Sequence, residues 1–322
     1  MGSHHLSIGD VIVKIDDLTI TQVAHQNIGL DRVIERQRFR DILSRHTYVT
    51  LDNGKTYKLD KTVGNVKREG SYTWDMVAPD TVCFKITDFM SAQGIIDMLQ
   101  SYRISEYEAR NWVIDVRHNY GGSDSAYFPL VPYIFGHDVS VSWLFHNDLG
   151  MYFNVTKRNR VLRMAAFEEV MDALDEAGRT AVKEMTAFFD KSDGMYLYDV
   201  DDDAEEMILT QPFPLCLPER VVILTDMNTS SSGESFVSVM RKSFNVKVIG
   251  RHTKGCLDYS NVAFQDYGSF EIGYPTSKLA AVAEGLSQNI LGEPVDIHIP
   301  WSPDMLKQDI DMARALALLS RA

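Results

Sequence analysis

Cysteine, basic residues and long apolar runs are all scarce in this 322-residue sequence. Its three cysteines, Cys83, Cys216 and Cys256, are odd in number and widely spaced, which favours neither a disulfide framework nor a zinc site. The 32 Lys and Arg residues are outnumbered by 45 Asp and Glu residues, giving a formal net charge of −13. We therefore expect no nucleic-acid partner, because phosphates are bound by basic surfaces. No segment approaches the roughly 20 apolar residues that span a bilayer, so no transmembrane segment is expected.

The bulk composition is ordinary for a globular protein. Hydrophobic residues make up 45% of the chain and charged residues 24%, with room for one large domain or two moderate ones. The first five residues, MGSHH, resemble an appended tag and are left out of the fold prediction. No motif calls for a metal or a cofactor. The acidic run at 199–206 lacks the loop glycine and closing Glu of an EF-hand, which favours a solvated loop.

The first 63 residues read as strands and turns around one helix. Residues 6–20 predict a strand, a turn and a short strand, and residues 30–43 have helical periodicity. A hairpin follows at 48–51 and 56–59, with Asp52-Asn53-Gly54 as its turn signal. This order resembles the later half of a PDZ domain, so we predict a partial PDZ-like module at 6–63. Residues 64–79 are polar and irregular, which predicts a linker.

Strands and helices alternate through the middle of the chain, which predicts an α/β core. Apolar strands are expected at 82–86, 112–116, 221–224 and 246–249, and helices at 91–102, 123–135 and 304–319. Residues 160–191 predict one long helix or two helices joined near Gly178.

The stretch 230–234 (SSSGE) lies between a predicted buried strand and a predicted helix. One interpretation is a capping box, in which Ser231 caps the helix and Glu234 reaches back to its N–H. The other is a nucleophile at a helix N-terminus, where unpaired N–H groups and the helix dipole favour a developing oxyanion.

A second strand end supplies Gly121 and Gly122. Glycines let backbone N–H groups approach a ligand closely, although the pair also fits a simple turn. In α/β sheets, sites collect at the carboxyl ends of strands, so the two loops are expected to meet. A serine hydroxyl that faces glycine N–H groups is the arrangement that acyl transfer requires.

Three segments together resemble the C-terminal processing, or tail-specific, serine peptidase family, which is related to the tricorn protease core. Residues 115–122 (DVRHNYGG) fit the pattern Asp-x-Arg-x-Asn-x-Gly-Gly, and residues 231–234 fit Ser-x-x-Glu. Residues 250–255 (GRHTKG) fit Gly-x-x-Thr-x-Gly. The resemblance covers most of the chain and implies a crotonase-like α/β catalytic domain at 64–322. The helical stretch at about 155–195 would be an insertion in it.

The resemblance implies Ser231 as the nucleophile. It implies oxyanion donors from Gly121 or Gly122 and from the Ser232 N–H. The lysine base of tail-specific members falls at Cys256 in this chain, and Lys254 lies two residues earlier. In an extended loop, that two-residue shift keeps Lys254 on the same face.

The identity of the base stays open at this level. A lysine accepts a proton only from a desolvated pocket that favours its neutral form, whereas Lys254 also fits a solvated loop residue. His252 is the rival on the same loop, and His118 adjoins the glycine pair. Tricorn-like members take a histidine from a segment ahead of the PDZ module, which this chain would lack if it were trimmed before residue 6.

The predicted function is that of a serine endopeptidase that cleaves flexible or C-terminal polypeptide segments through an acyl-enzyme on Ser231. Cys256 in place of the lysine motivates one alternative, a non-catalytic peptide-binding pseudoenzyme. An acyl-CoA enzyme on the same fold is another, and it would not need Ser231. Oligomeric state and compartment stay undetermined. No signal peptide is present, and the resemblance implies an extracytoplasmic location if the chain was trimmed.

Overall fold

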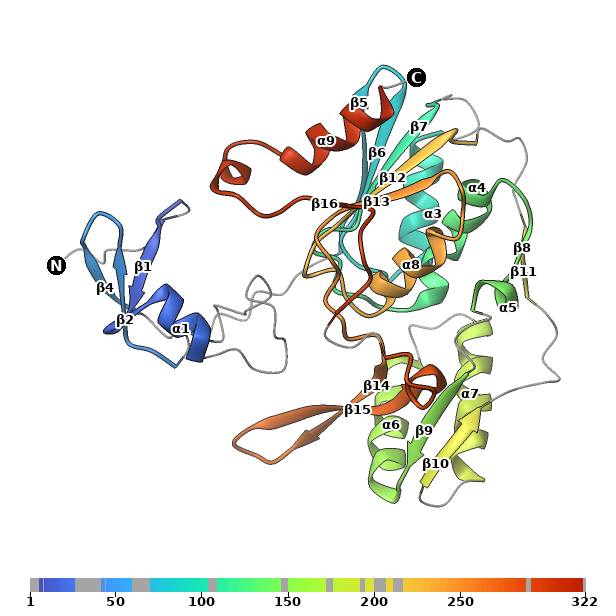
Figure 1. Cartoon of the computed structure of the whole chain (residues 1–322). Coiled ribbons are helices and arrows are strands. Elements are labelled where there is room, and N and C mark those ends of the chain that lie inside the picture. Colours follow the sequence, from blue (N-terminus) through green and yellow to red (C-terminus); the bar gives the residue numbers. More distant parts are fainter. Residues whose placement is uncertain are drawn as a thin grey trace.

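The computed structural model describes residues 6–7, 9–26, 42–43, 45–59, 70–103, 109–145, 150–171, 176–191, 195–199, 207–210, 217–287 and 291–320. Within these ranges the chain is a mixed α/β protein whose central element is a six-stranded sheet (Figure 1). In spatial order its strands are β16 (Ile297–His298), β13 (Val246–Gly250), β12 (Arg220–Thr225), β7 (Asn111–Asp115), β6 (Thr81–Ile86) and β5 (Tyr72–Ala78). All neighbouring pairs run parallel except β5 and β6, which are antiparallel. The four apolar strands predicted for the α/β core are confirmed.

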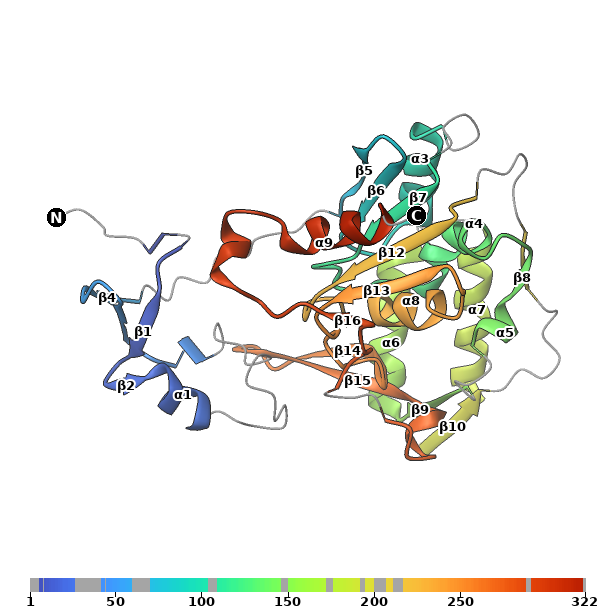
Figure 2. The same cartoon turned by 45° about the horizontal axis from the view of Figure 1, so that its top comes forward.

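Both faces of this sheet are buried, as expected for apolar parallel strands. Because side chains alternate across a strand, Val221 and Ile223 of β12 join one core cluster and Val222 and Leu224 join the other. Figures 1 and 2 show α3 (Ala92–Ser101), α4 (Val131–Phe135) and α8 (Ser232–Met240) on one face and α9 (Ile310–Leu319) on the other.

A second sheet carries the helical segment. Its strand order is β10 (Met195–Asp199), β9 (Met151–Val155), β15 (Glu271–Leu279) and β14 (Tyr259–Asp266), and α6 (Lys157–Val170) and α7 (Glu176–Asp190) accompany it (Figure 1). Two helices, the second of the predicted alternatives, are therefore present. The position of the break is wrong, because Gly178 lies within α7. One glycine costs a helix only about 1 kcal/mol, so it does not by itself end the helix.

The N-terminal segment forms a four-stranded sheet of its own. The order is β2 (Leu18–Thr19), β1 (Ile12–Ile15), β3 (Tyr48–Leu51) and β4 (Thr56–Lys58), with α1 (Ile20–Gln26) following β2. The predicted strand pair and hairpin are confirmed. Buried Ile15, Val23, Ile42 and Val49 form its core cluster. Most of the helix predicted at 30–43 falls outside the described residues.

Two other predictions need correction. The linker predicted at 64–79 is wrong for residues 72–78, which form β5 at the edge of the central sheet. An edge strand exposes one side and so tolerates the polar residues that suggested a linker. The helix predicted at 123–135 is a 3-10 helix, η2 (Asp124–Leu130), followed by the short α4, and Pro129 and Pro132 account for this irregularity.

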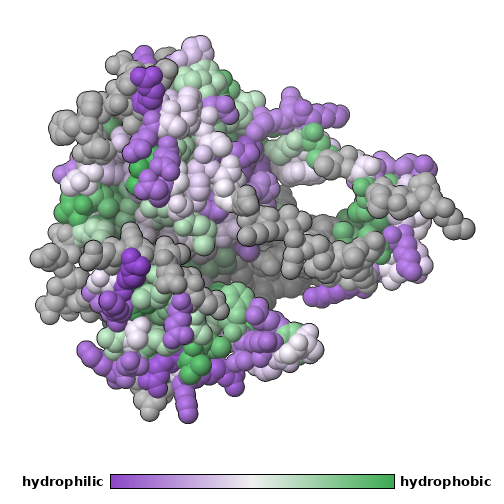
Figure 3. All heavy atoms as spheres, turned by 180° about the vertical axis from the view of Figure 1, so that it is seen from behind, coloured by the Kyte–Doolittle hydropathy of each residue, from purple (hydrophilic) through white to green (hydrophobic). Residues whose placement is uncertain are grey.

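Among the described residues, none of the helices combines the length and apolarity that a bilayer crossing requires. On the face opposite that of Figure 1, hydrophilic residues are spread widely, with smaller hydrophobic areas between them (Figure 3). A smaller strand pair joins β8 (Val139–Ser140) to β11 (Ile208–Leu209), and α5 (Val141–Leu144) directly follows β8.

Candidate active site

The carboxyl ends of β7 and β12 bring the two predicted loops together. The strands are parallel neighbours, with Leu224 opposite Asp115. The Thr229 hydroxyl donates to the Val116 carbonyl oxygen at 2.8 Å, which joins the loops just past the strand ends. The two loops therefore lie in contact, as the strand order predicts.

The Gly121 backbone lies directly against Ser231. Ser230 donates its N–H to the Asn119 carbonyl oxygen at 2.9 Å, which sets the two chains side by side. A Cβ atom added at Gly121 would stand 2.7 Å from the Ser231 Cβ and 3.3 Å from its Oγ. It would also be only 2.8 Å from the Ser230 carbonyl oxygen. Gly121 also has a φ of +94°, so neither the space nor the backbone conformation admits a side chain.

Ser231 itself has an unusual backbone for a residue that precedes a helix. Its φ and ψ are 54° and −125°. Three other hydroxyl residues that cap described α-helices, Ser91, Ser140 and Thr156, have φ values of −141°, −73° and −82°. Negative φ is the usual state of an N-cap, whereas a non-glycine residue at a sparsely populated positive φ carries about 1–3 kcal/mol of strain. Capping alone therefore does not account for the Ser231 conformation.

The two glycine N–H groups differ in availability. The Gly121 N–H donates to the side-chain oxygen of the fully buried Asn119 at 2.9 Å. Gly122 and Phe89 form a parallel β-bridge. Its two hydrogen bonds run from the Phe89 N–H to the Gly121 carbonyl oxygen and from the Ser123 N–H to the Phe89 carbonyl oxygen. The Gly122 N–H therefore points away from the bridge. Gly122 is exposed, and in the described part of the chain its N–H has no acceptor.

The Ser232 N–H is the second candidate donor. Ser232 is the first residue of α8, and the first four N–H groups of a helix have no partner within it. Over the described ranges its N–H likewise donates to no acceptor. The helix dipole adds positive potential at this end.

Glu234 connects the second and third motifs. Glu234 is only 1% exposed, and its carboxylate accepts the Ser231 N–H at 3.2 Å as part of the predicted capping box, which is present. It also accepts the Thr253 hydroxyl at 2.7 Å and the Gly255 N–H at 2.6 Å. The capping function of Glu234 therefore coexists with a link to the loop after β13.

The three candidate bases have different surroundings. Half-buried Lys254 donates its backbone N–H to the Thr229 carbonyl oxygen at 2.8 Å, which holds it beside the serine loop. The His252 ring is exposed and stands edge-on to His298, with 6.2 Å between ring centroids. His118 lies 3.3 Å from an Asp226 carboxylate oxygen and is 64% exposed.

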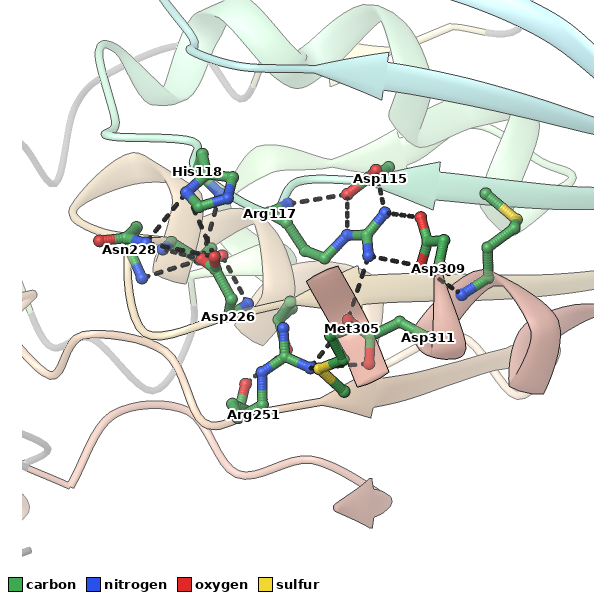
Figure 4. A network of polar contacts seen from close by, with 12 residues as sticks. Asp115, Arg117, His118, Asp226, Asn228, Arg251, Met305, Asp309 and Asp311 are labelled. Carbon is green, nitrogen blue, oxygen red and sulfur yellow. Dashed lines mark hydrogen bonds and ion pairs between the residues drawn. The ribbon is translucent and has the colours of Figure 1, made fainter. Parts of the chain in front are cut away.

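A charged network anchors α9 to the end of β7 (Figure 4). Arg117 donates to Asp115, Asp309 and Asp311 at 2.7–3.1 Å. Arg251 also donates to Asp311, at 2.7 and 2.8 Å. Burial by itself would lower the pKa of Arg117, but Asp115 and Asp309 raise it, so the guanidinium stays charged. Arg117, the arginine of the first motif, thus holds the α9 segment against the end of β7 rather than taking part in the glycine loop.

Acid should weaken this anchor through Asp309. Burial alone would raise the pKa of Asp309, but Arg117 and the Met312 N–H outweigh it and lower the pKa below 3.8. A carboxyl whose pKa is lower in the folded state stabilises the fold above its unfolded pKa and loses that contribution as pH falls through the folded value. We expect Asp309→Asn to flatten the loss of stability below about pH 4. Urea unfolding across pH 2–6 measures this, with exposed Asp304→Asn as the control. Equal slopes for Asp309→Asn and the wild type would contradict it.

Sequence reasoning missed Asn119, Glu234 as a link between loops, and the aspartates of the α9 segment. Asn119 stands in the first motif, so its position was a usable signal. The partners of Arg117 in α9 lie more than 190 residues away and carry no local signal.

Comparison with known proteins gives one matching family model and a set of similar solved structures. The model of peptidase family S41 matches residues 80–289. Mature CPAF complexed with lactacystin shares 11% sequence identity and a TM-score of 0.56, covering 99% of this chain and 78% of CPAF. A candidate peptidase from Parabacteroides merdae shares 16% identity and a TM-score of 0.46, and the match covers 79% of this chain and 66% of that one. The photosystem II D1 C-terminal processing protease shares 14% identity and a TM-score of 0.40 over 93% of this chain and 65% of that one.

No curated protein sequence matches the chain. The family match spans well over half of the sequence and contains all three motifs. The chain therefore belongs to peptidase family S41, the serine peptidases that its motifs resemble.

Proposed function

We propose that this chain is a serine endopeptidase that cleaves flexible or C-terminal polypeptide segments through an acyl-enzyme on Ser231. The observation that carries the proposal is the positive φ of Ser231 together with the Gly121 backbone against its side chain. A helix cap needs neither feature, whereas a nucleophile held in a sharp strand-to-helix turn uses both.

In this proposal the Ser231 hydroxyl attacks the peptide carbonyl, and the Gly122 and Ser232 N–H groups receive the developing negative charge. Gly121 allows its backbone to lie against the Ser231 side chain, but it supplies no oxyanion donor because its N–H is bonded to Asn119. Water then releases the acyl group. Each oxyanion donor of this kind is worth about 3–4 kcal/mol in other enzymes.

The direct test is covalent labelling. The protein is incubated with a serine-directed phosphonate, and the modified residue is identified by mass spectrometry. We expect modification at Ser231 together with turnover of a disordered peptide. Peptide binding with neither labelling nor turnover would overturn the proposal and support the peptide-binding pseudoenzyme.

Lys254 is the proposed general base. Its backbone is held at the serine loop by the hydrogen bond to the Thr229 carbonyl oxygen, and the residue is half-buried. His252 stands edge-on to His298, and His118 lies 3.3 Å from an Asp226 carboxylate oxygen.

Replacing Lys254 by methionine is expected to slow phosphonate labelling of Ser231 by about 10²–10⁴-fold, the usual contribution of a positioned base. Methionine keeps the length of the side chain and removes its proton-accepting nitrogen. His252→Gln is the matched control from the same loop and should label at the wild-type rate. If His252→Gln slows the labelling of Ser231 and Lys254→Met leaves the labelling rate unchanged, the base is His252.

The domain assignments belong to the same proposal. The four-stranded sheet of the first 63 residues supports a partial PDZ-like module. The six-stranded sheet with its helices supports a crotonase-like catalytic domain at 64–322. Helices α6 and α7 support the helical insertion at about 155–195.

A further inference from the structure

Glu234 has a set of contacts that exceeds the needs of a helix cap. Its Oε1 accepts the Thr253 hydroxyl and the Gly255 N–H. Its Oε2 accepts the Ser231 N–H at 3.2 Å, the Cys256 N–H at 2.9 Å and the Cys256 thiol at 3.3 Å. Five donors thus saturate a carboxylate with about four lone-pair sites, which leaves Glu234 unsuited to accept a proton from the Ser231 hydroxyl.

These donors are neutral groups. Within the described residues, Glu234 takes part in no ion pair, so the dipoles of the donors compensate its buried charge. A buried carboxylate depends on such hydrogen bonds, because an unsatisfied buried acceptor costs about 1–3 kcal/mol and a charged one more. The loss of one donor should therefore shift the carboxylate rather than leave it in place.

Cys256 donates to the same Glu234 oxygen, Oε2, that accepts the Ser231 N–H. Burial and the Glu234 charge raise the pKa of its thiol to about 11, while the facing Ser231 N–H opposes the rise. At neutral pH the thiol therefore stays protonated, and its S–H donates a hydrogen bond to the Glu234 carboxylate. The Ser231 N–H and the Cys256 thiol thus donate to the same Glu234 oxygen, Oε2.

We propose that Glu234 and Cys256 are positioning residues for Ser231: the thiol holds the Glu234 carboxylate at the Ser231 N–H and so maintains the positive-φ conformation of the serine. That conformation carries strain, and it persists only where surrounding contacts impose it. The inference rests on the proposed role of Ser231 as nucleophile. It assigns a role to a cysteine that stands where the family resemblance implies the lysine.

The test compares Cys256→Ala with Cys256→Ser. Alanine removes the side-chain donor, whereas serine retains a donor of similar size. For each variant and the wild type, the rate of phosphonate labelling at Ser231 is measured at a temperature where circular dichroism shows all proteins folded. We expect Cys256→Ala to label at least about 10-fold more slowly, the equivalent of about 1.4 kcal/mol, and Cys256→Ser to recover to within about 3-fold of the wild type.

Glu234→Gln should be slower than Cys256→Ala, because an amide has one acceptor oxygen where the carboxylate has two. If this variant does not fold, the cysteine pair still decides the question. Wild-type labelling with an unchanged rate in Cys256→Ala would overturn the inference, as would a Cys256→Ser variant as slow as the alanine one. A lower melting temperature with unchanged labelling would show a purely structural role and would also overturn it. Absence of labelling in the wild type would contradict the proposed function itself, so the two failures are distinguishable.

Discussion

Replacing Ser231 by alanine is expected to lower the rate of peptide-bond hydrolysis by about 10⁴-fold or more and to leave the protein folded. The substitution removes the hydroxyl that would form the acyl-enzyme. The contacts that shape the loop come from the backbone, including the Ser231 N–H to Glu234 and the Ser230 N–H to Asn119, and alanine retains them. The activity should therefore disappear without a large change in stability.

The measurement uses a fluorogenic disordered peptide at saturating concentration, with thermal unfolding followed in parallel. Ser238→Ala is the matched control, because Ser238 is half-buried on the same helix, seven residues later. The control should retain wild-type kcat. Wild-type peptide turnover in Ser231→Ala would contradict the nucleophile assignment.

Replacing Arg117 by methionine is expected to lower the free energy of unfolding by about 3–5 kcal/mol. The side chains of Asp115 and Asp311 are only 4% and 2% exposed, and both depend on the Arg117 guanidinium. Breaking a buried ion pair leaves uncompensated charge in a poorly solvated place, which costs more than the pair contributes. Arg251 still compensates Asp311, so Asp115 should bear most of the penalty.

Urea unfolding measures this loss, and Arg110→Met provides the control. Arg110 pairs with Glu219 at 2.8 Å, but the two side chains are 66% and 55% exposed. A solvated pair of this kind contributes about 0–1 kcal/mol, so the control should stay near the wild type. Equal losses for the two variants would contradict the anchoring role of Arg117. Because the anchor lies beneath the 118–122 loop, we also expect Arg117→Met to slow the labelling of Ser231.

The elements that sequence predicted well are those with a strong local pattern. The strand at 221–224 is apolar without interruption and the strand at 112–116 is broken only by Asp115, a pattern typical of strands covered on both faces. The position of the break in the helical segment and the edge strand β5 were not predicted. Gly178 is compatible with a helix, and β5 is half-exposed and polar enough to resemble a loop. In both places local composition allowed two states, and tertiary packing selected one.

The sequence by itself determined the loops in which we propose the chemistry, because glycine and hydroxyl residues directly follow buried strands and fit three ordered motifs. It could not determine the conformation of Ser231, the division of labour between Gly121 and Gly122, or the partners of Glu234. Those depend on how the ends of β7, β12 and β13 lie beside one another, and hence on contacts between residues about 20 to 110 positions apart. Only the packed sheet brings these groups within hydrogen-bond distance, which is why only the tertiary structure decided the geometry of the site.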